Sequence, residues 1–423
     1  MPLIQAEKAP KSLARLSSYL FLVQIAAYAL PLVTIPLLTR ALGSDGYGRL
    51  IFATTVGSYV LLLVDFGFSL SATRAIAVNR QNRDARSRIY LATTLSKSGF
   101  LLIGVLLLLV INAIIGGIGP DPKLIFIALG NAISSILMPD WYYQGTERTH
   151  IFSVIALSSR LAALPLLFCY VHSPSDIWAA LAINCWMPCV GGLVATGYLW
   201  LSREIRLVQI SATDVWDHIR SGAPCFVSMA GVNLYTTVNM TTIGATLGPA
   251  ALAYYAVAEK IVRICELCNM PITQAAYPRV AAEVAASKSR AKELIKRIAS
   301  VQLCIALLLS SVVIIFPDLI VKLLFGQSFG PAVAIVRIVA FIPLIKALSG
   351  VFGTLVMLNY GLTKSYTSTI VGAGVLSVCL LPIMLRANGA EGAAMNWLIV
   401  ETGIAICMIL MVNKSNVLNL APR

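Results

Sequence analysis

Long runs of apolar residues, separated by short polar connections, form the main pattern along the 423-residue chain. A helix that crosses a bilayer needs about 20 such residues, and twelve stretches reach that length. The stretches are continuously apolar, as in Leu101–Ile111, and lack the period-two alternation of membrane strands, so they are predicted to be helices. The predicted spans are 17–39, 49–72, 89–114, 123–145, 150–171, 176–201, 221–247, 250–277, 294–316, 331–358, 365–386 and 391–412.

The composition agrees with a membrane protein. Hydrophobic residues make up 58% of the chain and charged residues only 12%, and the mean hydropathy is +0.84. These values exclude a soluble enzyme, a nucleic-acid binder and a disordered chain.

The run at 17–39 is too long for the core of a signal peptide and lacks its cleavage site, so it is interpreted as the first span. Cys265 and Cys268 lie in an apolar stretch and are interpreted as packing residues.

The basic residues predict the topology. With both termini in the cytoplasm, and with residues at the ends of spans assigned to the nearer side, 21 of the 32 Lys and Arg fall on the cytoplasmic side, five on the other side and six inside spans. This asymmetry follows the positive-inside rule and accounts for most of the net charge of +14 without any nucleic acid. The predicted parts are a cytoplasmic N-terminus (1–16), an N-lobe (17–201), a cytoplasmic linker (202–220), a C-lobe (221–412) and a cytoplasmic C-terminus (413–423).

The two halves of the chain share a pattern. Leu42-Gly43 lies 31 residues before Arg74, and Leu247-Gly248 lies 31 residues before Arg279. Chance similarity between apolar helices is the alternative explanation. Parallel repeats of six helices each predict an all-α polytopic membrane protein with two pseudo-symmetric lobes around a central cavity. Lobes that rock about a polar linker are typical of a transporter.

Ionisable residues inside predicted spans are costly and are therefore candidate functional residues. Glu259, Arg263 and Glu266 are spaced at i, i+4 and i+7, so they share one helix face. That face is either an internally paired stripe or the wall of a water-filled cavity. Arg160 and Lys346 lie near the middle of their spans without an acid within one turn. Each is predicted to meet an anionic ligand or an acid from another helix.

Asp65 lies within the second predicted span and is a candidate proton site. Its alternative role is a structural bond to Lys97 or to a helix end. No catalytic constellation, metal cluster or cofactor motif is visible, because the three histidines lie near helix ends and no glycine-rich phosphate loop occurs. The protein is therefore not expected to be an enzyme. Transport energy would come from an ion gradient or from the gradient of the substrate.

Four segments in both halves resemble Wzx-type polysaccharide (O-antigen) flippases of the multidrug/oligosaccharidyl-lipid/polysaccharide exporter superfamily. Their order and spacing along the chain carry the resemblance. The segments are PLLTRALGSDGYG from Pro36 to Gly48, DFGFSLSATR from Asp65 to Arg74, DWYYQG from Asp140 to Gly145, and YYAVAEKIVR from Tyr254 to Arg263 continuing to QAAYPR, which ends at Arg279.

The resemblance implies a flippase that carries an undecaprenyl-diphosphate-linked oligosaccharide across the bacterial cytoplasmic (inner) membrane by alternating access. Cavity cations would then meet the diphosphate. Membrane lipid, a polysaccharide polymerase and the chain-length machinery are the implied partners. The implied diphosphate-binding residues are Lys260 and Arg263, then Arg40 and Arg74. The candidates for ion coupling are Asp65, Glu259 and Glu266.

Two other functions are weighed against a flippase. A drug/cation antiporter of the same superfamily would favour an acidic cavity, whereas this helix carries Lys260 and Arg263 beside its acids. A membrane-embedded glycan polymerase or ligase would need a large external loop. The longest predicted external loop, 317–330, has about 14 residues, so this second alternative is disfavoured.

Overall fold

The computed structural model describes residues 11–119, 121–415 and 417. Within these ranges the chain is built from helices and contains no strand. Its contacts divide it into two compact units, 1–41 with 56–227 and 42–55 with 228–423. Both predicted termini, 1–16 and 413–423, lie partly outside the described residues.

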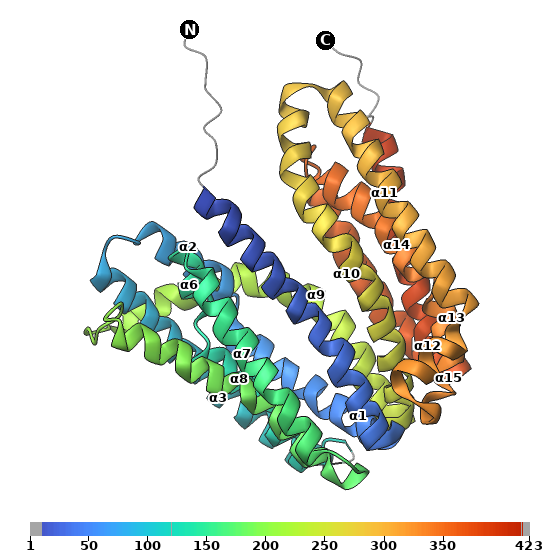
Figure 1. The fold of residues 1–423 in the computed structure, drawn as a ribbon, viewed down its shortest axis with the longest axis horizontal. Coiled ribbons are helices and arrows are strands. Elements are labelled where there is room, and N and C mark those ends of the chain that lie inside the picture. The colour runs from blue at the N-terminus through green and yellow to red at the C-terminus, as the bar shows by residue number, and fades with distance from the viewer. Residues whose placement is uncertain (1–10, 120, 416, 418–423) are drawn as a thin grey trace. The chain divides into compact units, whose positions relative to one another are not determined.

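The helices are drawn in Figure 1, where many of them carry the labels used here. Those up to residue 201 are α1 (Lys11–Asp65), α2 (Phe68–Val78), α3 (Arg83–Ile115), α4 (Pro122–Ala128), α5 (Gly130–Leu137), α6 (Asp140–Gly145), α7 (Thr149–Tyr170), a 3-10 turn (Pro174–Asp176) and α8 (Ile177–Leu201). Those that follow are α9 (Ala212–Leu247), α10 (Pro249–Ala286), α11 (Lys288–Ile315), α12 (Pro317–Phe325), a 3-10 turn (Gln327–Phe329), α13 (Ala332–Val339), α14 (Ile342–Ser349), the π-helical η3 (Gly350–Met357) and α15 (Thr363–Ser415).

The predicted helical membrane protein is confirmed, and the predicted apolar stretches lie in helical segments. Eight segments of the described chain are long and apolar enough to cross a bilayer. Two of these, Leu30–Val78 and Thr363–Ser415, have 49 and 53 residues. Each is too long for one crossing, which takes about 20 residues. Thr363–Ser415 contains the predicted spans 365–386 and 391–412, and Leu30–Val78 contains the span 49–72 and the end of the span 17–39. α9 and α10, which hold the predicted spans 221–247 and 250–277, are not among the eight.

The repeated Leu-Gly turn has the same backbone geometry in both halves. Gly43 has φ 67° and ψ −176° inside α1, and Gly248 has φ 88° and ψ 174° between α9 and α10. This region of φ and ψ is essentially restricted to glycine. The two turns therefore need glycine for the same reason, as the predicted repeat requires at this point.

Two predicted spans of the first unit are broken. The second predicted span breaks between α1 and α2, where Phe66 and Gly67 have φ values of 39° and 74°. A left-handed conformation costs a residue with a side chain about 1 kcal/mol, so the packing around Phe66 must hold it in place. The fourth predicted span breaks between α5 and α6 at Met138 and Pro139, whose φ values are −97° and −85°.

The two short helices beyond these breaks pack together. Phe68 and Ile76 of α2 share a buried cluster with Trp141, Tyr142 and Tyr143 of α6. Gly145 allows the two helices to approach closely, because a Cβ at this position would lie only 2.7 Å from the Ile76 side chain. α2 and α6 therefore form a pair at one end of the first unit.

Segment 42–55 of α1 packs in the second unit. Tyr47 packs edge-on against Phe329 with ring centroids 6.0 Å apart. Gly48 lies so close to α10 that a Cβ there would overlap the Pro249 carbonyl. Segment 42–55, which lies within the predicted N-lobe (17–201), is therefore part of the second unit.

The contact at Gly48 gives a stability prediction. Gly48→Ala forces the Pro249 backbone to move, so we expect the free energy of unfolding to fall by about 2 kcal/mol. The readout is the melting temperature of the purified protein in detergent. Gly99→Ala is the matched control, because Gly99 lies in a helix with no atom within 4 Å of the added Cβ. An equal fall in both variants would contradict the close contact.

Candidate functional site

One face of α10 carries a group of paired charges in the second unit. Arg263 lies between two glutamates of its own helix, with Nη2 3.7 Å from Glu259 Oε1 and Nη1 3.5 Å from Glu266 Oε2. The predicted spacing thus places the three side chains together. Glu259 Oε2 has no hydrogen-bond partner among the described residues and lies 3.6 Å from Lys260 Nζ.

Lys346 of α14 joins this face to α15. Its Nζ lies 2.8 Å from Glu266 Oε1 and 3.4 Å from Glu401 Oε1, and 5.7 Å from the centre of the Trp397 ring. Trp397 Nε1 donates a hydrogen bond of 3.2 Å to Glu401 Oε1. Of the two partners expected for Lys346, an anionic ligand or an acid from another helix, the structure shows the acid.

These side chains line a cavity in the second unit, here called the charged pocket. Its volume is about 40 Å³, which holds a few water molecules but no large ligand. The lining residues are Asn239, Met240, Tyr255, Glu259, Arg263, Glu266, Lys346, Trp397 and Glu401. In this conformation the acidic and basic side chains of the pocket are paired with one another.

The ion pairs of the charged pocket balance in charge. Three carboxylates, Glu259, Glu266 and Glu401, face the three cations Lys260, Arg263 and Lys346. The Glu401 side chain is only 5% exposed, whereas that of Arg263 is 58% exposed. A buried carboxylate is stable only with its cation in place, so Glu401 depends on Lys346, and Arg263 is the accessible cation.

The structure brings five of the nine predicted site residues together in the second unit, namely Lys260, Arg263, Lys346, Glu259 and Glu266. Lys260 pairs with Glu259 but is not among the residues that line the pocket. The other four, Arg40, Arg74, Arg160 and Asp65, belong to the first unit. The three arginines among them are exposed.

Sequence reasoning counted Glu401 among the acids inside predicted spans without assigning it to the site, and it missed Trp397. Glu401 is an acid inside a predicted span, which was a usable signal. Trp397 precedes it by one helical turn and had no such signal, because tryptophan is common in apolar spans.

Asp65 pairs with a buried lysine, as its structural alternative predicts. Lys97 Nζ lies 3.2 Å from Asp65 Oδ1 and donates to the carbonyl and hydroxyl of Ser135, each at 3.1 Å. Ser69 donates to the other oxygen of Asp65 at 3.2 Å. This carboxylate is therefore fully engaged in the present conformation.

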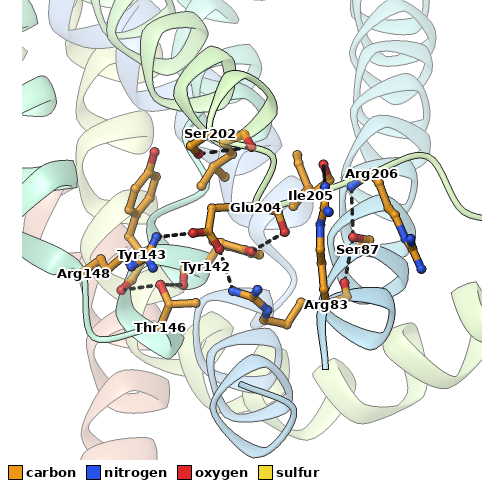
Figure 2. A network of polar contacts seen from close by, with 12 residues as sticks. Arg83, Ser87, Tyr142, Tyr143, Thr146, Arg148, Ser202, Glu204, Ile205 and Arg206 are labelled. Atoms are coloured by element: carbon orange, nitrogen blue, oxygen red, sulfur yellow. Dashed lines mark hydrogen bonds and ion pairs between the residues drawn. The ribbon is translucent and has the colours of Figure 1, made fainter. Parts of the chain in front are cut away.

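A second polar cluster surrounds Glu204, just after α8 (Figure 2). Glu204 Oε2 lies 2.9 Å from Arg86 Nη1, and Oε1 lies 2.5 Å from Arg148 Nη1. The backbone carbonyl of Glu204 accepts a hydrogen bond of 3.3 Å from Tyr142. One carboxylate thus joins α3, the connection after α6 and the connection after α8.

The residues next to Glu204 are anchored in the same way. Arg206 N donates to Ser87 Oγ at 3.0 Å, the Ile205 carbonyl accepts from Arg83, and Arg206 pairs with Asp84. The first part of the predicted linker 202–220 is therefore fixed to the first unit. Its second part is helical, because α9 already begins at Ala212.

Comparison with known proteins finds one matching family and several relatives. The model of the family described as "Polysaccharide biosynthesis protein" matches residues 13–284. A relative from Escherichia coli (strain K12), named "Putative O-antigen transporter", is 28% identical over 407 residues, which cover 96% of this chain and 98% of the relative. A protein of the same name from Shigella dysenteriae is 25% identical over 62% of this chain and 65% of its own length.

Solved structures share the fold at low sequence identity. An inward-facing multidrug transporter of the MATE family and MOP superfamily has a TM-score of 0.74 at 13% identity, over 92% of this chain and 94% of its own. The lipid II flippase MurJ in an inward closed conformation also has a TM-score of 0.74, at 11% identity, over 93% of this chain and 87% of its own. The relatives and neighbours are transporters and flippases, in agreement with a protein that is not an enzyme.

Glu204 gives a prediction with a defined pH dependence. Burial raises the pKa of Glu204, but hydrogen bonds from Arg148 and Arg86 outweigh that effect and lower it. Its contribution to stability is therefore present above the unfolded pKa, near 4.5, and is lost as the pH falls through the lower folded pKa. Glu204→Gln should reduce the free energy of unfolding at pH 7 by about 2 kcal/mol.

The check is the melting temperature of both proteins from pH 7 down to about pH 3, because the contribution is lost below the unfolded pKa. The difference between wild type and Glu204→Gln should shrink as the pH falls below 4.5. Glu147→Gln is the control, because this exposed carboxylate pairs with Arg80 on the surface and its loss should change the melting temperature little. A constant difference at all pH values would refute the role of the Glu204 charge.

Proposed function

Because the chain belongs to the polysaccharide biosynthesis protein family, we propose that it is a flippase that carries a lipid-linked oligosaccharide across the bacterial inner membrane. The relatives named as O-antigen transporters and the fold shared with a lipid II flippase support this function. The carrier lipid in the proposal is undecaprenyl diphosphate. The observation that carries the proposal is the charged pocket, with cations inside predicted membrane spans.

The diphosphate binds the cations of the charged pocket in this proposal. Phosphate oxygens prefer charge-assisted hydrogen bonds from Lys and Arg. Arg263 is the exposed cation, and Lys346, 29% exposed, lies deeper. Both already pair with carboxylates, so a bound diphosphate has to replace Glu266 and Glu401 as their partner. Lys260 extends the same cationic group at its edge.

Replacement of the carboxylates links transport to an ion. Glu266 and Glu401 would lose their cation in a medium of low dielectric, where an unpaired carboxylate is strongly disfavoured. Uptake of a proton or another cation would neutralise them, and Glu259 would respond in the same way when Arg263 turns to the ligand. Coupling through Asp65 is a weaker part of the proposal, because Lys97 and Ser69 already hold that carboxylate.

Other parts of the function stay predictions. Arg40, Arg74 and Arg160 are proposed as further contacts for the lipid-linked substrate, and a polymerase and chain-length machinery as partners. Export of cationic drugs is disfavoured, because the three acids of the charged pocket are matched by three cations. The likeness to a MATE transporter concerns the fold alone.

A liposome assay tests the function. The purified protein is reconstituted with a fluorescent undecaprenyl-diphosphate-linked sugar, and leaflet exchange is measured by quenching the outer leaflet. We expect wild type to accelerate exchange, and Lys346→Met to reduce the acceleration at least about tenfold through the loss of a charge-assisted contact. Lys364→Met is the matched control, because this lysine is exposed at the start of α15. No acceleration by wild type would reject the proposed function.

A double variant separates binding from folding. Lys346→Met leaves Glu401 buried without its cation, and this alone could unfold the protein. Lys346→Met with Glu401→Gln removes both charges, so we expect it to fold with a melting temperature near wild type but still to transport poorly. Normal transport by the double variant would show that Lys346 serves only to neutralise Glu401.

A further inference from the structure

The break between α1 and α2 is held by three aromatic rings. Phe66, at the break, lies between Phe100 of α3 and Phe226 of α9, with ring centroids 4.3 and 4.6 Å away. Both pairs are stacked, at interplanar angles of 16° and 14°. The sandwich fixes a residue whose φ of 39° is unfavourable outside glycine.

The backbone of α9 lies directly against the same break. A Cβ on Gly67 would lie 2.6 Å from Cys225 Cβ and 2.8 Å from Phe226 N. A Cβ on Gly222 would lie 2.8 Å from the Phe66 carbonyl oxygen. Two glycines on opposite sides of the contact thus let α9 sit in the break at a distance that any side chain would prevent.

Lys97 ties this break to the one between α5 and α6. Pro139 has no N–H, so the carbonyl of Ser135, four residues earlier, has no partner within its own helix. Lys97 donates to that carbonyl and pairs with Asp65, the last residue of α1. A cation at the C-terminal ends of two helices is favoured by their dipoles. The two breaks are thereby held together by one side chain.

α9, the helix that packs in the break, continues from the first unit into the second. The boundary between the two units falls within α9, between Val227 and Ser228. Phe226 is thus next to the point where the chain passes to the second unit, while Phe66 and Gly67 mark the start of α2. A displacement of α9 along or away from the break would therefore move Phe226 relative to Phe66 and Gly67, and would also move the chain where it enters the second unit.

We propose that Phe66, Gly67, Gly222, Cys225 and Phe226 form a joint that couples α9 to α2. During alternating access α9 leaves the break, the Phe66 sandwich opens, and the α2–α6 pair turns about the two breaks held by Lys97. Hinges of this kind concentrate the change of backbone angle in a few residues. The joint rests on the proposed function, because it assigns the motion to the transport cycle.

The native thiol of Cys225 allows a direct test. In a protein whose other cysteines are replaced by alanine, Gly67→Cys places a second thiol against Cys225, close enough for a disulfide after a small shift. Leaflet exchange of the fluorescent undecaprenyl-diphosphate-linked sugar is measured before oxidation, after oxidation and after reduction. We expect oxidation to reduce exchange at least about tenfold and reduction to restore it.

The matched control is the same protein with Cys225→Ser, in which the oxidant should have no effect. Lipid exchange by the Gly67→Cys protein before oxidation tests the proposed flippase function in the same liposomes. A failure of that function is therefore distinguished from a failure of the joint. The joint would be overturned if the cross-linked protein exchanged lipid as fast as the same protein before oxidation.

A second measurement leaves Gly67 unchanged, in case its replacement prevents folding. The protein that keeps only Cys225 is labelled with a membrane-permeable maleimide, with and without undecaprenyl diphosphate. Departure of α9 from the break should change the labelling rate at least about threefold. Equal rates, in a protein that exchanges lipid normally, would overturn the joint.

Discussion

The bilayer offers no water to a charge, and this constraint explains how the buried charges inside the predicted spans are arranged. An ionised side chain inside a span is stable only if another side chain or a backbone group takes the place of water. Lys97 meets the requirement with Asp65 and Ser135. The charged pocket meets it with a chain of pairs from Lys260 to Glu401.

The same constraint gives the charged pocket its proposed mechanism. Each cation already has a carboxylate, so an anionic ligand can bind only in exchange for one. Lys346 is the centre of this exchange because its two partners come from different helices, Glu266 from α10 and Glu401 from α15. Binding at Lys346 would therefore change how α10, α14 and α15 are held together, which connects ligand recognition to a change of conformation.

The sequence predicted most of the fold because the bilayer imposes a simple rule. Length and continuous apolarity identified the helices, and the glycines at 43 and 248 marked equivalent turns whose backbone only glycine adopts readily. The breaks at Phe66 and Met138 were not predicted, because an apolar run reads the same whether its helix is straight or interrupted. The assignment of segment 42–55 to the second unit depends on contacts between residues far apart in the chain.

The candidate site was predicted only in part, for a related reason. The spacing of Glu259, Arg263 and Glu266 fixes their common face, since all three belong to one helix. The link from Lys346 to Glu401 joins separate helices, and no local pattern reveals it. Glu204 looked like one of several charges in a polar connection, and only its two arginine partners distinguish it.

The central claim, that ligand and carboxylates compete for Lys346, is tested most directly by equilibrium binding of undecaprenyl diphosphate to three purified proteins. The account predicts weaker binding by Lys346→Met than by wild type, and tighter binding by Glu401→Gln, because the glutamine releases the lysine from a competing charge. A shift of both variants in the same direction, or an unchanged affinity in both, would contradict it.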